Sequence, residues 1–365
     1  MKKKLLWIIT PILILLALIG TGVGISIGKR PNPNTENRTD EESKIPNQDN
    51  ENNNVNPTPN EENQKINLPQ IITKRDLGTF LENNITEANI LLKVKELNSE
   101  FKDRDVTSLI VEKFKYTAII KASSEDSTFK GEVEVRFIPI DQSGAKRSVY
   151  NQDQTICEEF GYYKETNGDW RLELFDHSIN SVPEELPWFI TSLEAAFEDN
   201  FNTIIKGLDK WDTSNVTNMA LMFNRAEEFN QDISHFNTSN VTDMSAMFYK
   251  AFNFNQPLNK WNTSNVTNMS QMFTESKSFN QPLNNWNTSN VTDMSAMFYG
   301  AKSFNQPLNN WNTSNVTDMD FMFKSAKSFN QDISSWDVPK CNEFEDFIKD
   351  ATKMTEDLIP KKFRK

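Results

Sequence analysis

Side chains that commonly perform catalysis or bind metal ions are scarce in this chain. Its 365 residues include two histidines, His177 and His235, and two cysteines, Cys157 and Cys341. Two cysteines make no disulfide framework, and neither has a metal-ligand pattern around it. We interpret Cys157 as a bystander thiol and Cys341 as a small buried hydrophobic residue. The residue types therefore predict no catalytic site, no metal site and no cofactor, and they favour binding or architecture over an enzyme.

Asparagines and aspartates at fixed positions are the other candidates for chemistry. Two series of asparagines recur along the chain: Asn215, Asn240, Asn265, Asn290 and Asn315, and Asn230, Asn255, Asn280, Asn305 and Asn330. Each repeat also has at most one carboxylate near the same turn, such as Asp243 or Asp293. Since Ca²⁺ usually takes several carboxylates, we favour asparagines that bond backbone groups of the turns over a calcium site.

These residues belong to a 25-residue repeat that fills about half of the polypeptide. One unit, WNTSNVTDMSAMFYGAKSFNQPLNN, spans residues 286–310 and restarts almost unchanged at Trp311. Upstream copies begin at Trp261, Phe236 and Trp211, and a degraded sixth copy begins at Trp336. A fixed period of this length indicates a solenoid, in which each unit buries its apolar face against its neighbours.

The apolar positions of one unit predict its local structure. Four of them have the spacing of one stripe on a short helix: Met294, Met297, Phe298 and Ala301. Residues 288–290 could cap this helix, and residues 306–312 fit a short strand that would stack into a parallel sheet. The predicted repeat core comprises Trp211, Phe236, Trp261, Trp286, Trp311, Trp336, Met244, Met269, Met294, Met319, Phe248, Phe273, Phe298 and Phe323.

A candidate binding surface follows from the polar residues that recur just before each tryptophan. Near-identical units would present these side chains at regular spacing, which suits a multivalent contact with a protein or glycan. The candidate residues are Asn259, Lys260, Asn284, Asn285, Asn309 and Asn310.

The first 65 residues predict an anchor and a spacer. Three lysines precede an uncharged apolar run at residues 5–28, which is long enough to span a bilayer. The lysines favour a cytoplasmic N-terminus with the bulk of the chain extracellular, or secreted if residues 1–30 are cleaved as a signal. Residues 31–65 are rich in Asn, Pro and acidic residues, and we expect them to form a disordered linker.

Between the linker and the repeats, the sequence predicts two small regions. Residues 66–140 read as an α+β module, with near-helical apolar spacing over 76–102 and strand-like residues at 106–122 and 129–140. Residues 141–187 read as a β-hairpin bridge and lead-in, with its turn at Asn167-Gly168. The net charge of −12 argues against nucleic acid as a partner.

The repeat FNQPLNNWNTSNVTDMSAMFYGAKS resembles the BspA-like leucine-rich repeat of mycoplasma surface proteins, the palindromic amphipathic repeat family. The resemblance covers roughly residues 183–358. It implies an α/β-type, leucine-rich-repeat-like solenoid at residues 188–365, with short parallel strands, short helices and terminal caps. It also implies a surface location and no enzymatic activity. This chain departs from the family at Phe236, which replaces tryptophan, and in lacking a lipoprotein cysteine after the apolar run.

We expect a cell-surface protein that binds host or neighbouring-cell macromolecules. The alternative is a structural or antigenically variable coat protein without one specific ligand. Loss of binding on changing the repeat surface would favour the first hypothesis, and variation in repeat number without loss of binding would favour the second.

Overall fold

The computed structural model describes residues 65–364. The predicted membrane segment at residues 5–28 and the linker as far as residue 64 lie outside the described residues. Among residues 65–364, no helix combines the length and the apolar character needed to cross a bilayer.

Residues 66–140 form a small module of mixed helices and strands, as predicted. Its elements are β1 (Ile66–Asn67), α2 (Leu68–Ile71), β2 (Asp76–Leu81), the 3₁₀ turn η1 (Glu82–Asn84), α3 (Glu87–Leu97), β3 (Leu109–Lys113), β4 (Thr117–Ala122), β5 (Phe129–Lys130) and β6 (Glu132–Ile140). The main sheet has the order β2-β6-β4-β3, in which β2 runs parallel to β6 and the other pairs are antiparallel. Strands β1 and β5 pair separately.

The strand predicted at 129–140 is confirmed, while the helix predicted over 76–102 is only partly correct. In β6, Val133, Val135 and Phe137 are buried and alternate with exposed residues. Residues 76–81 form strand β2 instead of helix, because they pair with β6. The helix α3 starts only after Thr86, whose side-chain oxygen accepts a hydrogen bond from the Asn89 amide at 3.2 Å.

The bridge contains β7 (Ala145–Lys146), β8 (Val149–Tyr150), β9 (Cys157–Glu159), β10 (Tyr162–Lys164) and β11 (Trp170–Leu172). The predicted hairpin is confirmed as β10 and β11, which pair antiparallel around a turn where Gly168 has φ 100°. The alternation of Ile156, Phe160 and Tyr162 also predicts that these side chains share one face and that Cys157 lies on the other. This prediction is wrong for residues 156 and 157. Ile156 is exposed and Cys157 is buried, because residue 157 lies in β9 and pairs with β8 rather than with β11.

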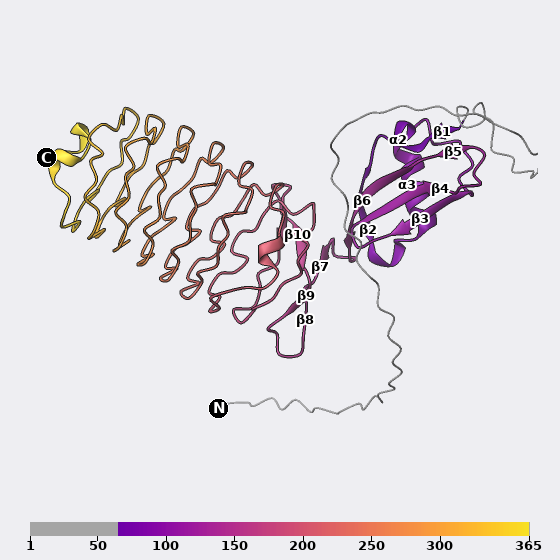
Figure 1. Ribbon diagram of the computed structural model, residues 1–365, viewed down its shortest axis with the longest axis horizontal. Coiled ribbons are helices and arrows are strands. Elements are labelled where there is room, and N and C mark those ends of the chain that lie inside the picture. The colour runs from indigo at the N-terminus through magenta and orange to yellow at the C-terminus, as the bar shows by residue number, and fades with distance from the viewer. Residues whose placement is uncertain (1–64, 365) are drawn as a thin grey trace, which may run out of the picture. The chain divides into compact units, whose positions relative to one another are not determined.

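From β11 onward, successive coils pair through parallel bridges of one residue each, and the step between bridges is 25 residues from Asn218 to Glu343. Figure 1 shows this part of the chain, coloured pink to yellow, as a series of similar loops. The bridges join Arg171, Ser192, Asn218, Asp243, Asn268, Asp293, Asp318 and Glu343 in turn. The only helical elements between residue 173 and residue 364 are the 3₁₀ turns η2 (Leu208–Lys210), η3 (Glu356–Leu358) and η4 (Lys361–Phe363).

The predicted short helices and strands of the unit are therefore wrong in detail. Residues 294–301 form turns instead of a helix, with left-handed backbone at Ala296 (φ 50°) and Gly300 (φ 64°). Their amides donate to the next coil, Ala296 to Asp320 O at 2.7 Å and Gly300 to Lys324 O at 2.8 Å. Bonds between coils replace the i→i−4 bonds of a helix, so the left-handed residues are tolerated despite their steric cost.

Residues 306–312 form no strand either, because the parallel contact between coils lies at Asp293 and its equivalents. The side chains of the unit nevertheless stack in register. Phe298 lies 5.6 Å from Phe273 and 5.5 Å from Phe323 between ring centroids, with the rings nearly parallel. The tryptophans stack similarly, with Trp286 and Trp311 6.4 Å apart. These ladders form one continuous hydrophobic core along the repeat region.

The spacing of Leu193, Ala196 and Phe197 predicts a divergent first coil with one inserted residue, and in the structure this coil contains that residue. Its bridge joins Ser192 to Asn218, a separation of 26 residues instead of 25. Leu208 and Trp211 are buried as their spacing predicts, but Ile204 is 58 % exposed and the neighbouring Ile205 is buried instead. The same spacing predicts that Ile204 corresponds to the buried Phe304 of a later unit, and this prediction is wrong because Ile205 is the buried residue in this coil.

Candidate functional site

The threonines and asparagines of the repeat signature hold neighbouring coils together. Thr288 is 1 % exposed, and its hydroxyl donates to Asn312 O in the following unit at 2.9 Å. The Asn290 side-chain amide donates to Ser264 O in the preceding unit at 2.7 Å. Equivalent bonds recur in the other units at Thr213, Thr238, Thr263 and Thr313, and at Asn215, Asn240, Asn265 and Asn315.

The second asparagine series forms a continuous hydrogen-bonded ladder. Asn280 Oδ1 accepts from the amide of Asn305 at 2.9 Å and from Gln306 Nε2 at 3.1 Å. The amide of Asn280 itself donates to Asn255 Oδ1 at 2.9 Å. The prediction that stacked asparagines bond backbone groups is thereby confirmed. These side chains already have partners in the fold.

The tryptophans contribute a polar contact as well as their rings. Trp286 Nε1 donates to Leu258 O at 3.0 Å, and Trp311 Nε1 donates to Leu283 O at 3.0 Å. Phe236 has no such donor, so its unit keeps the packing but lacks this bond. All fourteen residues of the predicted repeat core are buried in the structure.

The predicted binding surface lies on the outside of the coils. Asn285 and Lys260 are exposed, as are Asn259, Asn309 and Asn310. Asn284 is half-buried, and its Oδ1 accepts from the amide of Asn310 at 3.1 Å. The residue just before the tryptophan or Phe236 also differs between units, as Lys210, His235, Lys260, Asn285, Asn310 and Ser335.

A different strip of the repeats carries the side chains that vary most between units. It lies on the turn with the two left-handed residues, at residues 245–250, 270–275, 295–300 and 320–325. The position of Tyr299 is occupied in the other units by Asn224, Tyr249, Thr274 and Lys324, and the position of Phe321 by Leu221, Ala246, Gln271 and Ala296. We call this surface the variable strip.

The variable strip contains a cavity with partly exposed aromatic rings. The cavity has a volume of about 300 Å³ and is lined by Tyr249, Gln271, Thr274, Ala296, Tyr299, Phe321 and Lys324. Thr274 is buried, and its hydroxyl donates to Ala296 O at 2.5 Å. The small side chain at this position leaves space between the tyrosines of the two flanking units. The apolar periodicity of the sequence predicts only the buried side chains of this turn. The sequence signal for its outer side chains is their variation between units.

Three carboxylates gather on the last coils. Oxygens of Asp318, Asp320 and Glu343 lie within 4.8 Å of one another. The prediction of at most one carboxylate per unit near this turn is wrong here, because one unit supplies both Asp318 and Asp320 and the next coil adds Glu343. Burial raises the pKa of the Asp318 carboxyl, and the nearby charges of Asp293, Asp320 and Glu343 act in the same direction. In earlier coils, an asparagine separates the aspartates, and Asn268 Nδ2 donates to Asp243 Oδ2 at 3.3 Å.

Both cysteines are buried, with no disulfide. Burial raises the pKa of the Cys157 thiol to about 12 and that of the Cys341 thiol to about 11. Both thiols therefore stay protonated at neutral pH, which makes them poor nucleophiles and metal ligands.

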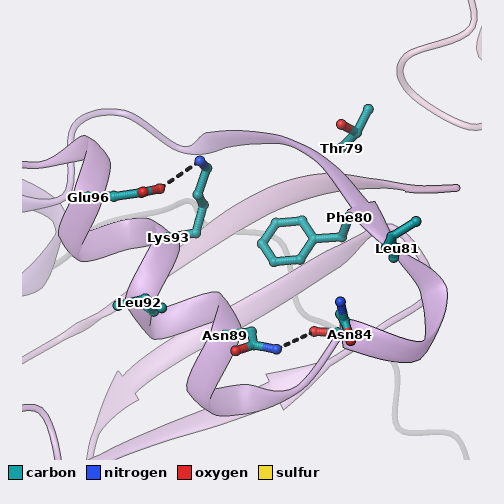
Figure 2. A pocket seen from close by; sticks show the side chains of 8 residues that line it. All are labelled: Thr79, Phe80, Leu81, Asn84, Asn89, Leu92, Lys93 and Glu96. Atoms are coloured by element: carbon teal, nitrogen blue, oxygen red, sulfur yellow. Dashed lines mark hydrogen bonds and ion pairs between the residues drawn. The ribbon is translucent and has the colours of Figure 1, made fainter. Parts of the chain in front are cut away.

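The small module has a second cavity that the sequence did not reveal. Figure 2 shows it between strand β2 and helix α3. Its volume is about 340 Å³, and its lining comprises Thr79, Phe80, Leu81, Asn84, Asn89, Leu92, Lys93 and Glu96. Lys93 Nζ lies 2.6 Å from Glu96 Oε2, so these two charges neutralise each other. The eight side chains include no nucleophile with an adjacent base, and the cavity offers no catalytic arrangement.

Comparison with known proteins locates a family match in the repeat region. A family model described as "Mycoplasma protein of unknown function, DUF285" matches residues 191–290 and again residues 280–364. The two matches together cover the 25-residue units and their C-terminal end. No curated protein and no solved structure matches the chain.

Proposed function

We propose that this chain is a cell-surface binding protein whose repeat region is a leucine-rich-repeat-like solenoid. The variable strip is the observation that carries the proposal. Recurring polar side chains of the unit bond neighbouring coils, whereas the strip brings together several positions whose side chains differ between units. Residues that vary on a constant scaffold are suited to recognition, because the scaffold fixes their positions.

The composition of the strip supports contact with a macromolecule. Tyr249, Tyr299 and Phe321 are aromatic side chains that stay partly exposed, and tyrosine and phenylalanine are enriched where proteins meet partners. They line one cavity together with polar groups from Gln271 and Thr274. Such a surface offers apolar contact area with a few placed hydrogen-bonding groups. The apolar run at residues 5–28, which is long enough to span a bilayer, supports a location at the cell surface.

The proposal is tested with the full-length protein in a binding assay on cultured animal cells. The strip variant combines Tyr249→Thr, Tyr299→Thr and Phe321→Ala, residue types that other units already have at these positions. The matched control combines Asn285→Ser and Asn310→Ser on the exposed face, since Ser335 occupies that position in the last unit. We expect the strip variant to lose about tenfold or more in affinity, since aromatic anchors dominate binding energy, and the control to bind as the wild type does.

Wild-type protein that binds no cell or extracellular matrix above background would overturn the proposal and favour the coat-protein alternative. Loss of binding in the control but not in the strip variant would move the binding surface back to the asparagines before each tryptophan.

A further inference from the structure

Lysines occupy the same position in three consecutive units next to the variable strip. Lys277, Lys302 and Lys327 each stand three residues after the strip position of Thr274, Tyr299 and Lys324. Lys302 and Lys327 are exposed and Lys277 is half-buried. We call these three residues the lysine row.

The register of the coils aligns the lysine row. Two residues after each lysine comes a buried phenylalanine, and the rings of Phe279, Phe304 and Phe329 stack 6.0 and 5.8 Å apart between centroids. Because the backbone repeats at this step, the three lysine side chains leave the stack one above another. Like charges at the same position of neighbouring coils repel each other, so the row has an electrostatic cost.

No ion pair in residues 65–364 relieves this repulsion. Lys324 and Lys349 both lie 2.9 Å from the carboxylate of Asp346, whereas Lys277, Lys302 and Lys327 form no ion pair among the described residues. Instead, the Lys277 ammonium lies 3.3 Å from the centroid of the Phe252 ring, which occupies the same position one unit earlier. The row is thus a line of free positive charge on a chain whose net charge is −12.

We propose that the lysine row and the variable strip together bind an acidic polysaccharide, a linear glycan with sulfate or carboxylate groups. This inference rests on the proposed function as a surface binding module and names its ligand class. A line of evenly spaced ammonium groups complements a polymer with evenly spaced anions, and the glycan crosses the coils along the stack. Lysine suits single, separate anions, whereas paired phosphate contacts usually involve the planar fork of arginine.

The variable strip beside the lysine row offers aromatic and hydrogen-bonding side chains that can contact the uncharged parts of a sugar. Tyr249 and Tyr299 offer ring faces and hydroxyls, and Gln271 and Thr274 between them offer groups for hydrogen bonding to sugar hydroxyls. Lys324 at the edge of the cavity lies three residues from Lys327, within about 10 Å along the chain. One ligand can therefore contact both the aromatic cavity and the lysine row.

The test measures heparin fragments binding to full-length protein in detergent by calorimetry, at several salt concentrations between about 50 and 200 mM. The row variant combines Lys277→Gln, Lys302→Gln and Lys327→Gln. The control combines Lys74→Gln, Lys102→Gln and Lys206→Gln, three exposed lysines elsewhere with the same total change in charge. We expect the row variant to bind about tenfold or more weakly. Its affinity should also depend less steeply on salt concentration, because binding through fewer lysine contacts releases fewer counterions. The control should change affinity less than about twofold.

Equal losses in both variants, or no binding of heparin and chondroitin sulfate by the wild type, would overturn the inference. So would tighter binding to a single-stranded oligonucleotide or to anionic lipid vesicles than to either glycan. If the wild type binds cells but neither glycan, this inference fails while the proposed function stands. If it binds neither cells nor glycans, both fail. Unchanged tryptophan fluorescence of the row variant shows that any loss is not due to unfolding.

Discussion

The small module and the repeat region use polar side chains in opposite ways. In the module, the sheet β2-β6-β4-β3 and helix α3 enclose one apolar core, and most polar side chains face outward. In the repeat region, threonine and asparagine side chains bond the backbone of the next or previous coil in every unit. A coil of turns without helix or sheet ladders leaves many backbone N–H and C=O groups without a backbone partner. The threonine and asparagine side chains supply hydrogen bonds to some of these groups.

One residue of the module behaves like the repeat asparagines. Asn98 is 4 % exposed, and its Oδ1 accepts from the amides of Thr73 and Lys74 while its Nδ2 donates to Val94 O at 3.0 Å. The module contains this device once, where the chain leaves α3, and the repeat region contains it in each coil. The comparison shows that polar residues repeated between units bond the backbone of neighbouring coils. The proposal that residues differing between units bind a partner builds on this difference.

The largest effect should come from emptying the aromatic core of either region. We expect Phe298→Ala, with its ring stacked between Phe273 and Phe323, to cost about 3–5 kcal/mol of the free energy of unfolding. The matched variant Phe129→Ala removes a buried ring of the module core. Residues 65–140 contain no tryptophan, and seven of the eight tryptophans lie at residues 170–336. With Trp7→Phe in the reference protein and in both variants, tryptophan fluorescence during urea unfolding reports on the repeat region and the bridge.

Phe298→Ala should therefore shift the fluorescence transition to lower urea, and Phe129→Ala should leave it nearly unchanged. Equal shifts in the two variants would show that the two cores unfold as one. The module and the repeat region would then not differ in how their cores contribute to the free energy of unfolding.

A smaller effect is expected from a single hydroxyl. Thr288→Val keeps the shape of a buried side chain but removes the bond to Asn312 O, which costs about 1–3 kcal/mol for the carbonyl left unsatisfied. Thr79→Val changes an exposed threonine of β2 in the module and should stay within about 0.5 kcal/mol. Urea unfolding, followed by fluorescence for the first variant and by circular dichroism for the second, measures both. A neutral Thr288→Val would contradict the structural role of the repeat threonines.

The smallest expected effect is a gain in stability. Because the folded-state pKa of Asp318 is raised, its charged form destabilises the fold, and this penalty is present above the raised pKa and declines as the pH falls toward 3.8. Asp318→Asn, which restores the residue of earlier rungs such as Asn268, should stabilise the protein by about 0.2–1 kcal/mol at pH 7. The difference between variant and wild type should shrink on acidification, as measured by thermal unfolding across pH. A difference independent of pH would exclude the charge as its cause.

The apolar pattern of the sequence predicts the module strands, the hairpin and the repeat core because burial follows side-chain type. It does not predict the backbone of the unit, since Met294, Met297, Phe298 and Ala301 have helical spacing but lie on turns. Backbone propensity does not predict the left-handed conformation of residues such as Ala296, because bonds to a neighbouring coil stabilise it. Strand β2 was missed for a similar reason, since its pairing with β6 involves residues far apart in sequence.

The candidate site was predicted only in outline. Asparagine ladders could be foreseen because stacking brings equal positions together. The variable strip required the structure, which shows that the positions of Tyr299 and Phe321 line the same cavity. The carboxylates of Asp318 and Glu343 meet only across a bridge between coils, which no count within a unit reveals.

One pair of variants tests the central claim most directly. The claim is that recurring polar side chains bonded to a neighbouring coil stabilise the fold, whereas recurring polar side chains without such a bond do not. Asn280→Ala removes the acceptor of the Asn305 amide and of Gln306 Nε2, whereas Asn285→Ala removes an exposed side chain five residues away. The measurement is the free energy of unfolding from urea titration of the full-length protein. We expect Asn280→Ala to lose about 1–3 kcal/mol and Asn285→Ala to stay within about 0.5 kcal/mol. Equal losses, or a larger loss at Asn285, would contradict the account.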